Sequence, residues 1–220
     1  MWSDLKAKFK RYVTEIAYED ILEQIKADKD LYEKVVEYEK KADRYEDRLG
    51  SYLVKVSATE LSDEDAAEAT KLLHIIGDLE RISDYAVNIL NSVDEIRDKK
   101  LEFSGECQKE LEVMVNAVRG VVELSYEAFS TGSLEKAMLV EPLEQVVDDL
   151  KEQIRVRHIK RLQKEECTME HGFVLSDILT NLERVSDHCS NVASCIIEMV
   201  EHEDLDIHEY KNHLKEKGEF

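Results

Sequence analysis

The chain has 220 residues, of which 43% are hydrophobic, so it is long enough to bury one sizeable core or two small ones. Its 50 acidic and 30 basic residues give a formal net charge of -20. This charge disfavours nucleic acid and anionic lipid as partners and favours cations or basic proteins, although solubility alone also explains it. No apolar run approaches the roughly 18 residues of a membrane span, and no signal-peptide pattern is present. We expect a soluble chain.

One proline and seven glycines leave few positions for turns, so the helices are expected to be long. The expected breaks between helices are, in chain order, 27–30, 57–62, 99–105, 131–133 and 165–168. Ser62 and Asp65 resemble a capping box at the start of the third helix, with Asp in place of Glu or Gln. Pro142 predicts a kink or a broken first turn in the fifth helix. Residues 204–220 are predicted to form a polar helical tail.

Two segments of the sequence repeat each other. The segment "LLHIIGDLERISDYAVNIL" begins at Leu72 and "LSDILTNLERVSDHCSNVA" begins at Leu175. The identical pairs are Leu79/Leu182, Glu80/Glu183, Arg81/Arg184, Ser83/Ser186, Asp84/Asp187 and Asn88/Asn191. Both segments carry apolar or small residues at alternating steps of three and four, which indicates one buried seam on each helix. The sequence therefore predicts an all-α chain built from a duplicated unit of three helices. The expected boundaries are 1–100, 101–204 and a tail at 205–220.

The motif Glu-x-x-x-Asp occurs at corresponding places in both repeats. Its four copies are Glu39/Asp43, Glu80/Asp84, Glu144/Asp148 and Glu183/Asp187. Residues four apart share a helix face, and each of these carboxylates follows a seam position by one residue, so it flanks the core. An antiparallel hairpin of the second and third helices would gather four carboxylates in each repeat. Such clusters suit hard cations, whereas an acidic face exposed to solvent is the alternative for any single motif.

Other polar residues near the motifs leave alternatives open. Arg81 and Arg184 are interpreted as structural ion-pair partners that bridge to carboxylates of a neighbouring helix. Asn88 and Asn191 are either ligands or groups that hydrogen-bond between helices. Of the histidines, only His188 merits attention, because it adjoins Asp187.

The four cysteines form no CxxC pair and no disulfide framework. We interpret them as free thiols in the cytoplasm, and Cys189 falls on an apolar stripe that predicts a core position. Zinc binding through these cysteines is not expected. No phosphate-cradling glycine loop and no nucleophile motif is present.

The segments "DLERISDYAVNI" and "NLERVSDHCSNV", with "EYEKKAD" and "PLEQVVD", resemble the paired motifs of the PhoU family of phosphate-uptake regulators. The stretches "LGSYLVKVS" and "RHIKRLQKEECTMEHGFVLSDILTNLERVSDHCSN" are similar to the cytoplasmic C-terminal domain of sodium/phosphate cotransporter family proteins. The resemblance extends from the first helix to about residue 200. It implies two pseudo-symmetric three-helix bundles and multinuclear metal clusters, with iron expected first and manganese, zinc, magnesium or calcium as alternatives.

The resemblance also implies which residues bind the metal and what the domain does. The ligands would be Glu39, Asp43, Glu80 and Asp84 in the first repeat and Glu144, Asp148, Glu183 and Asp187 in the second. Two departures suggest that the second site holds fewer metal ions or none: Asp78 corresponds to Asn181, and Pro142 has no counterpart in the first repeat.

The leading hypothesis is a non-enzymatic, cytoplasmic regulator of phosphate transport that contacts a phosphate transporter or a membrane histidine kinase. The basic residues Lys6, Lys8, Lys10 and Arg11 suit a position near a membrane, and equally suit an ordinary amphipathic helix. The alternatives are a carboxylate-bridged di-metal enzyme, which usually adds a Glu-x-x-His motif that is absent here, and a metal-free acidic scaffold. The sequence does not determine the oligomeric state.

Overall fold

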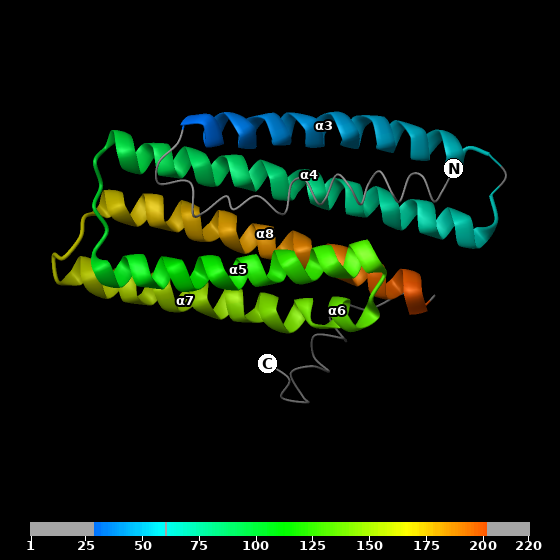
Figure 1. The fold of residues 1–220 in the computed structure, drawn as a ribbon. Coiled ribbons are helices and arrows are strands. Elements are labelled where there is room, and N and C mark those ends of the chain that lie inside the picture. Colours follow the sequence, from blue (N-terminus) through cyan, green and yellow to red (C-terminus); the bar gives the residue numbers. More distant parts are fainter. Residues whose placement is uncertain (1–28, 60, 202–220) are drawn as a thin grey trace.

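The computed structural model describes residues 29–59 and 61–201, and every regular element in these residues is an α-helix (Figure 1). The helices are α3 (Lys29–Ser57), α4 (Asp63–Asp98), α5 (Gly105–Thr131), α6 (Leu134–Met138), α7 (Val140–Gln163) and α8 (Met169–Glu201). The prediction of an all-α fold is confirmed. The expected first helix, its basic residues and the polar tail lie outside the described residues.

The long helices lie side by side with their axes roughly aligned, and α3 and α4 run in opposite directions (Figure 1). α3 packs on α4, α4 packs on α8, and α8 packs in turn against α5 and α7. The short α6 contacts α5, α7 and α8 at one end of the molecule. α4 and α8 carry the repeated sequence segments, so the extensive contact between them joins the two copies of the motif. The predicted boundaries at residues 100 and 204 stay a prediction.

Capping residues explain where α4 begins and where α5 ends. The Ser62 hydroxyl accepts a hydrogen bond from the Asp65 N–H at 3.1 Å and donates one to the Asp65 carboxylate at 2.7 Å. This confirms Ser62 as the N-cap of α4, with the Asp side chain bonding the hydroxyl rather than the backbone. Gly132 ends α5 in the left-handed region at φ 66°, a conformation that glycine adopts without steric cost.

The predicted disturbance near Pro142 is present as a break in the chain of helices. α6 ends at Met138, and α7 begins at Val140 after a single residue, Leu139. Pro142 then lies in the first turn of α7, where the missing N–H removes no intrahelical hydrogen bond. The predicted fifth helix is therefore a short helix followed by a long one.

The core is built around α8, which places buried side chains against each of its neighbours. These include Leu175, Leu179, Leu182, Val192 and Ile196. Small residues lie among them, and Ser186 and Cys189 are almost completely buried, which confirms the predicted core position of the cysteine. Ser83 is the corresponding small buried residue of α4. Small side chains at these positions let helix backbones approach closely.

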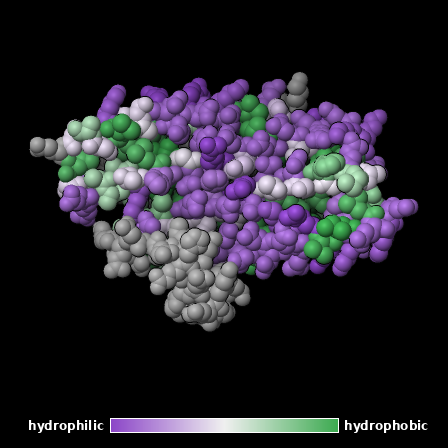
Figure 2. Space-filling view, turned by 180° about the vertical axis from the view of Figure 1, so that it is seen from behind, coloured by the Kyte–Doolittle hydropathy of each residue, from purple (hydrophilic) through white to green (hydrophobic). Residues whose placement is uncertain are grey.

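Hydrophilic residues cover most of the surface in Figure 2, while hydrophobic residues gather toward the two ends. Met169 and Phe173, at the start of α8, are among the most exposed large apolar side chains. None of the helices in the described part of the chain is long and apolar enough to cross a membrane.

The duplicated leucines provide a test of this packing. Leu182 of α8 is almost fully buried, whereas its counterpart Leu79 of α4 is only partly buried. We expect Leu182→Ala to lower the free energy of unfolding by about 2–5 kcal/mol, because it removes core contacts and leaves a cavity. Leu79→Ala is expected to cost clearly less. Urea denaturation followed by circular dichroism measures both values, and equal losses would contradict the described burial.

Candidate metal centres

The first acidic cluster lies between α3 and α4. Glu39 and Asp43 of α3 and Asp84 of α4 each offer a carboxylate oxygen, and the three oxygens lie within 4.8 Å of one another. The spacing of four residues places Glu39 and Asp43 on one face of α3, and the packing of α3 on α4 brings Asp84 to that face. The predicted convergence of these three residues is thus present in the structure.

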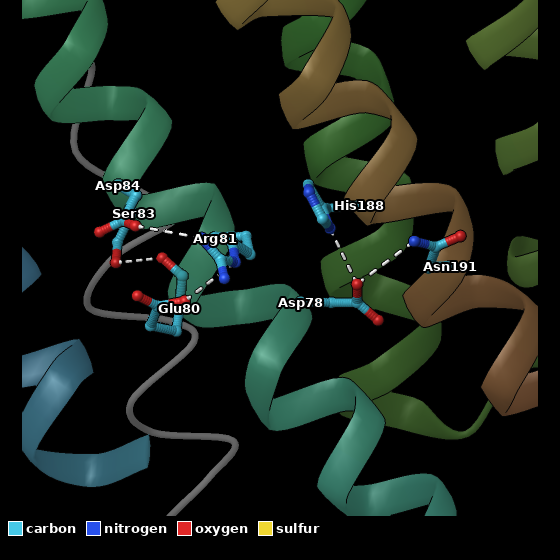
Figure 3. A network of polar contacts seen from close by, with 7 residues as sticks. All are labelled: Asp78, Glu80, Arg81, Ser83, Asp84, His188 and Asn191. Carbon is cyan, nitrogen blue, oxygen red and sulfur yellow. Dashed lines mark hydrogen bonds and ion pairs between the residues drawn. The ribbon is translucent and has the colours of Figure 1, made fainter. Parts of the chain in front are cut away.

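Glu80, the fourth residue predicted for this cluster, lies beside Asp84 on the side of α4 that faces α3 (Figure 3). Burial and the negative charge of Asp84 raise the pKa of Glu80 to about 6. Burial, Asp43 and Asp84 also raise the pKa of Glu39. Both pKa values are raised because negatively charged groups lie close together in a partly desolvated place. A bound cation would reduce the repulsion between them.

The repeated arginines form ion pairs, but within their own helix. Arg81 lies 3.6 Å from a Glu80 oxygen and 3.9 Å from an Asp84 oxygen, and Arg184 makes the equivalent contacts with Glu183 and Asp187. The prediction that these arginines bridge to a neighbouring helix is wrong, because the long side chain bends back along the helix. Arg81 is 60% exposed, so solvent screens its attraction to the cluster.

The second acidic cluster lies between α7 and α8 and repeats the first. Glu144 and Asp148 of α7 and Asp187 of α8 bring carboxylate oxygens within 4.8 Å of one another. Glu144 is buried, so this triad is set more deeply than its counterpart, in which Glu39 is only half-buried. All-oxygen triads from two helices fit a hard cation, and both triads meet that condition.

The fourth residue of the second cluster has a partner that sequence reasoning missed. The Lys151 ammonium nitrogen of α7 lies 3.0 Å from the Glu183 Oε1 of α8. A signal was available: Lys151 follows Asp148 by three residues, and the corresponding residue in the first repeat is Glu46. Glu141 was also missed; it is buried in α7 and accepts a hydrogen bond from Ser190 of α8.

A polar contact links α4 to α8, on a different side of α4 from Glu80 and Asp84 (Figure 3). His188 Nδ1 lies 2.8 Å from the Asp78 Oδ1, and the Asn191 amide donates to the same oxygen at 3.3 Å. The His188 ring stacks on Tyr85, with 5.6 Å between ring centroids. His188 and Asn191 therefore join the two repeats, and for Asn191 hydrogen bonding between helices is the alternative that the structure supports.

The family model for the PhoU domain matches residues 13–93 and again residues 111–196. The chain belongs to the PhoU family. The two matched segments contain all eight residues of the acidic motifs. Among curated relatives, the chain is 29% identical over 126 residues to "Phosphate-specific transport system accessory protein PhoU homolog 1" of Thermotoga maritima. That match covers 57% of this chain and 53% of the relative, so the chain spans about half the length of that protein.

Other comparisons cover more of the chain. It is 28% identical to the PhoU homolog of Zymomonas mobilis, over 84% of this chain and 77% of that protein. PhoU from Pseudomonas aeruginosa superimposes with a TM-score of 0.76 at 19% identity, covering 91% of this chain and 93% of that one. PhoU from Streptococcus pneumoniae gives the same TM-score at 17% identity, with coverages of 93% and 96%. These structures confirm the PhoU fold. The narrower resemblance to sodium/phosphate cotransporters stays a prediction.

The raised pKa of Glu80 makes the stability of this PhoU domain depend on pH. A carboxyl whose pKa is higher in the folded state binds its proton more tightly there, so stability falls as the pH rises from about 4.5 to about 6. In metal-free buffer at pH 7.5, we expect Glu80→Gln to be about 1 kcal/mol more stable than the parent chain.

Urea denaturation across pH 4 to 8 measures this difference. The advantage of Glu80→Gln is expected to disappear at pH 4, where the carboxyl is protonated. Asp98→Asn removes one charge from an exposed position of the same helix and controls for net charge. An advantage that persists at pH 4 would contradict the explanation.

The contact between Asp78 and His188 is expected to couple the two repeats energetically. In a double-mutant cycle of Asp78→Ala and His188→Ala, we expect a coupling energy of about 1 kcal/mol in the free energy of unfolding. Asp78→Ala combined with Lys160→Ala of α7 serves as the distant pair and should be additive. Additivity of the Asp78 and His188 variants would show that the contact contributes nothing to stability.

Proposed function

We propose that this PhoU-family chain regulates phosphate transport, and that it does so as a metal-binding domain that docks on a membrane partner. The names of the curated relatives support the first part, because they describe accessory proteins of phosphate-specific transport systems. A regulatory role is also consistent with the absence of a nucleophile motif or Glu-x-x-His motif from the sequence. We therefore propose no catalytic residue.

The observation that carries the metal proposal is the convergence of Glu39, Asp43 and Asp84 within 4.8 Å from two different helices. Like charges held this close repel one another, and this repulsion adds to burial in raising the pKa values of Glu39 and Glu80. A bound cation would neutralise the carboxylates and cross-link α3 to α4. Oxygen ligands suit iron in its ferric state, with manganese, zinc, magnesium or calcium as alternatives.

The docking proposal follows from charge. The net charge of -20 favours a basic partner surface, such as the cytoplasmic side of a phosphate transporter or of a membrane histidine kinase. Bound metal would alter both the charge and the rigidity of the α3–α4 pair. The domain would then present a different surface to its partner in the metal-bound and metal-free forms.

Metal analysis of the purified full chain tests the proposal. The variant Glu39→Gln/Asp84→Asn removes two ligands of the first cluster and should lose the metal bound there, measured by plasma mass spectrometry after dialysis against Mn²⁺ or ferric iron. The parent chain, when loaded, should also melt at a higher temperature, because binding stabilises the folded state.

The matched control is Glu33→Gln/Asp98→Asn, which removes two charges from exposed positions on the same two helices. It should bind metal like the parent chain. Equal metal contents in the parent and in Glu39→Gln/Asp84→Asn would reject the first cluster as a metal site and favour the metal-free scaffold.

A further inference from the structure

The second acidic cluster has a partly buried lysine beside it. In the second cluster, the Lys151 ammonium lies 3.0 Å from Glu183, and the two side chains are only 17% and 16% exposed. Two half-buried charges of opposite sign at this distance attract each other more strongly than an exposed pair would. Lys151 and Glu183 come from α7 and α8, the same helices that supply the triad of Glu144, Asp148 and Asp187.

The first cluster has an acidic residue at the position of this lysine. Glu46 follows Asp43 on α3 as Lys151 follows Asp148 on α7. Among the described residues, the ion pair of Glu80, the counterpart of Glu183, is made with the exposed Arg81 at 3.6 Å. Other charges near the clusters differ as well, because Lys40, Lys41 and Arg44 of α3 correspond to Gln145, Val146 and Asp149 of α7. What distinguishes Lys151 is its close contact with Glu183 across two helices.

We propose that Lys151 is a built-in counter-cation of the second cluster, so that the two clusters divide their roles: the first binds a metal ion, and the second is neutralised by the protein itself. This inference rests on the proposed metal-binding function and refines it. An ammonium group beside Glu183 satisfies that carboxylate and repels a second cation brought to the neighbouring triad. The second cluster would then be a fixed structural junction between α7 and α8.

The surroundings of Glu183 make it costly for a metal ion to displace Lys151. The Glu183 Oε2 is inaccessible to solvent and makes no hydrogen bond in the structure, and Arg184, which lies 3.9 Å from it, is 53% exposed. Displacing Lys151 would leave Glu183 without its close partner in a partly desolvated place, which is costly. Metal binding at the second cluster must therefore compete with an existing interaction.

Mn²⁺ titrations of the full chain test the inference, because each cluster can be studied with the other disabled. Glu39→Gln/Asp84→Asn leaves the second cluster, and Asp148→Asn/Asp187→Asn leaves the first. We expect the Kd for Mn²⁺ at the second cluster to be at least about tenfold higher than at the first. Adding Lys151→Met to the variant that retains the second cluster should lower its Kd about tenfold.

Three further variants separate the charge of Lys151 from its packing. Lys160→Met removes an exposed lysine from the same helix and should leave the Kd unchanged. Lys151→Arg keeps the charge and should keep the weak binding. The reciprocal variant, Glu46→Lys in the chain that retains the first cluster, should weaken Mn²⁺ binding there. Circular dichroism confirms folding, and Lys151→Gln replaces Lys151→Met if the latter fails to fold.

The outcomes distinguish this inference from the function on which it rests. Equal Kd values at the two clusters, with no change in Lys151→Met or Lys151→Gln, would overturn the role of Lys151 and leave metal binding intact. Absence of Mn²⁺ binding from the parent chain and from every variant would overturn both. Tighter binding in Lys151→Met but not in Lys160→Met supports the proposal.

Discussion

The packing of α4 against α8 is the contact on which the rest of the structure depends. Each of these helices carries one copy of the repeated segment, and each also holds one side of an acidic cluster. Each helix buries a serine at the same place in the repeat, Ser83 on α4 and Ser186 on α8, while leucine and isoleucine side chains fill the core. Since α3 packs on α4, and α7 on α8, the position of every acidic triad is set by this central pair.

The sequence predicted the helical class, the breaks within the described residues and two clusters of four carboxylates, and six of these eight carboxylates form the two triads. Those predictions succeeded because they rest on periodicity and on spacing within a helix, which are local properties. Prediction from the sequence failed where a long side chain can reach carboxylates on more than one helix. Arg81 could reach either its own helix or the next one, and only the packing of α3 and α4 decides between them. The reach of Lys151 to Glu183 depends on α7 and α8 in the same way.

The duplication produces the same arrangement of helices twice, yet the carboxylates of the two acidic clusters have different neighbours. In the first copy, burial and the neighbouring carboxylates raise the pKa values of Glu39 and Glu80. In the second copy Lys151 forms an ion pair with Glu183, beside the triad. The departures visible in the sequence, Asn181 and Pro142, do not account for this difference. Asn181 donates a hydrogen bond to the backbone of its own helix, and Pro142 only shapes the start of α7.

The two clusters lie on opposite sides of the central helix pair, one between α3 and α4 and the other between α7 and α8. Packed helix axes are about 8–10 Å apart, so two such layers separate the clusters by roughly 20 Å. At that distance the direct interaction between a charge at one cluster and a charge at the other is small, about 1 kcal/mol at an effective dielectric constant of about 20. Side chains such as Asp78 and His188, which physically join α4 to α8, therefore provide a shorter connection between the repeats than the charges of the clusters do.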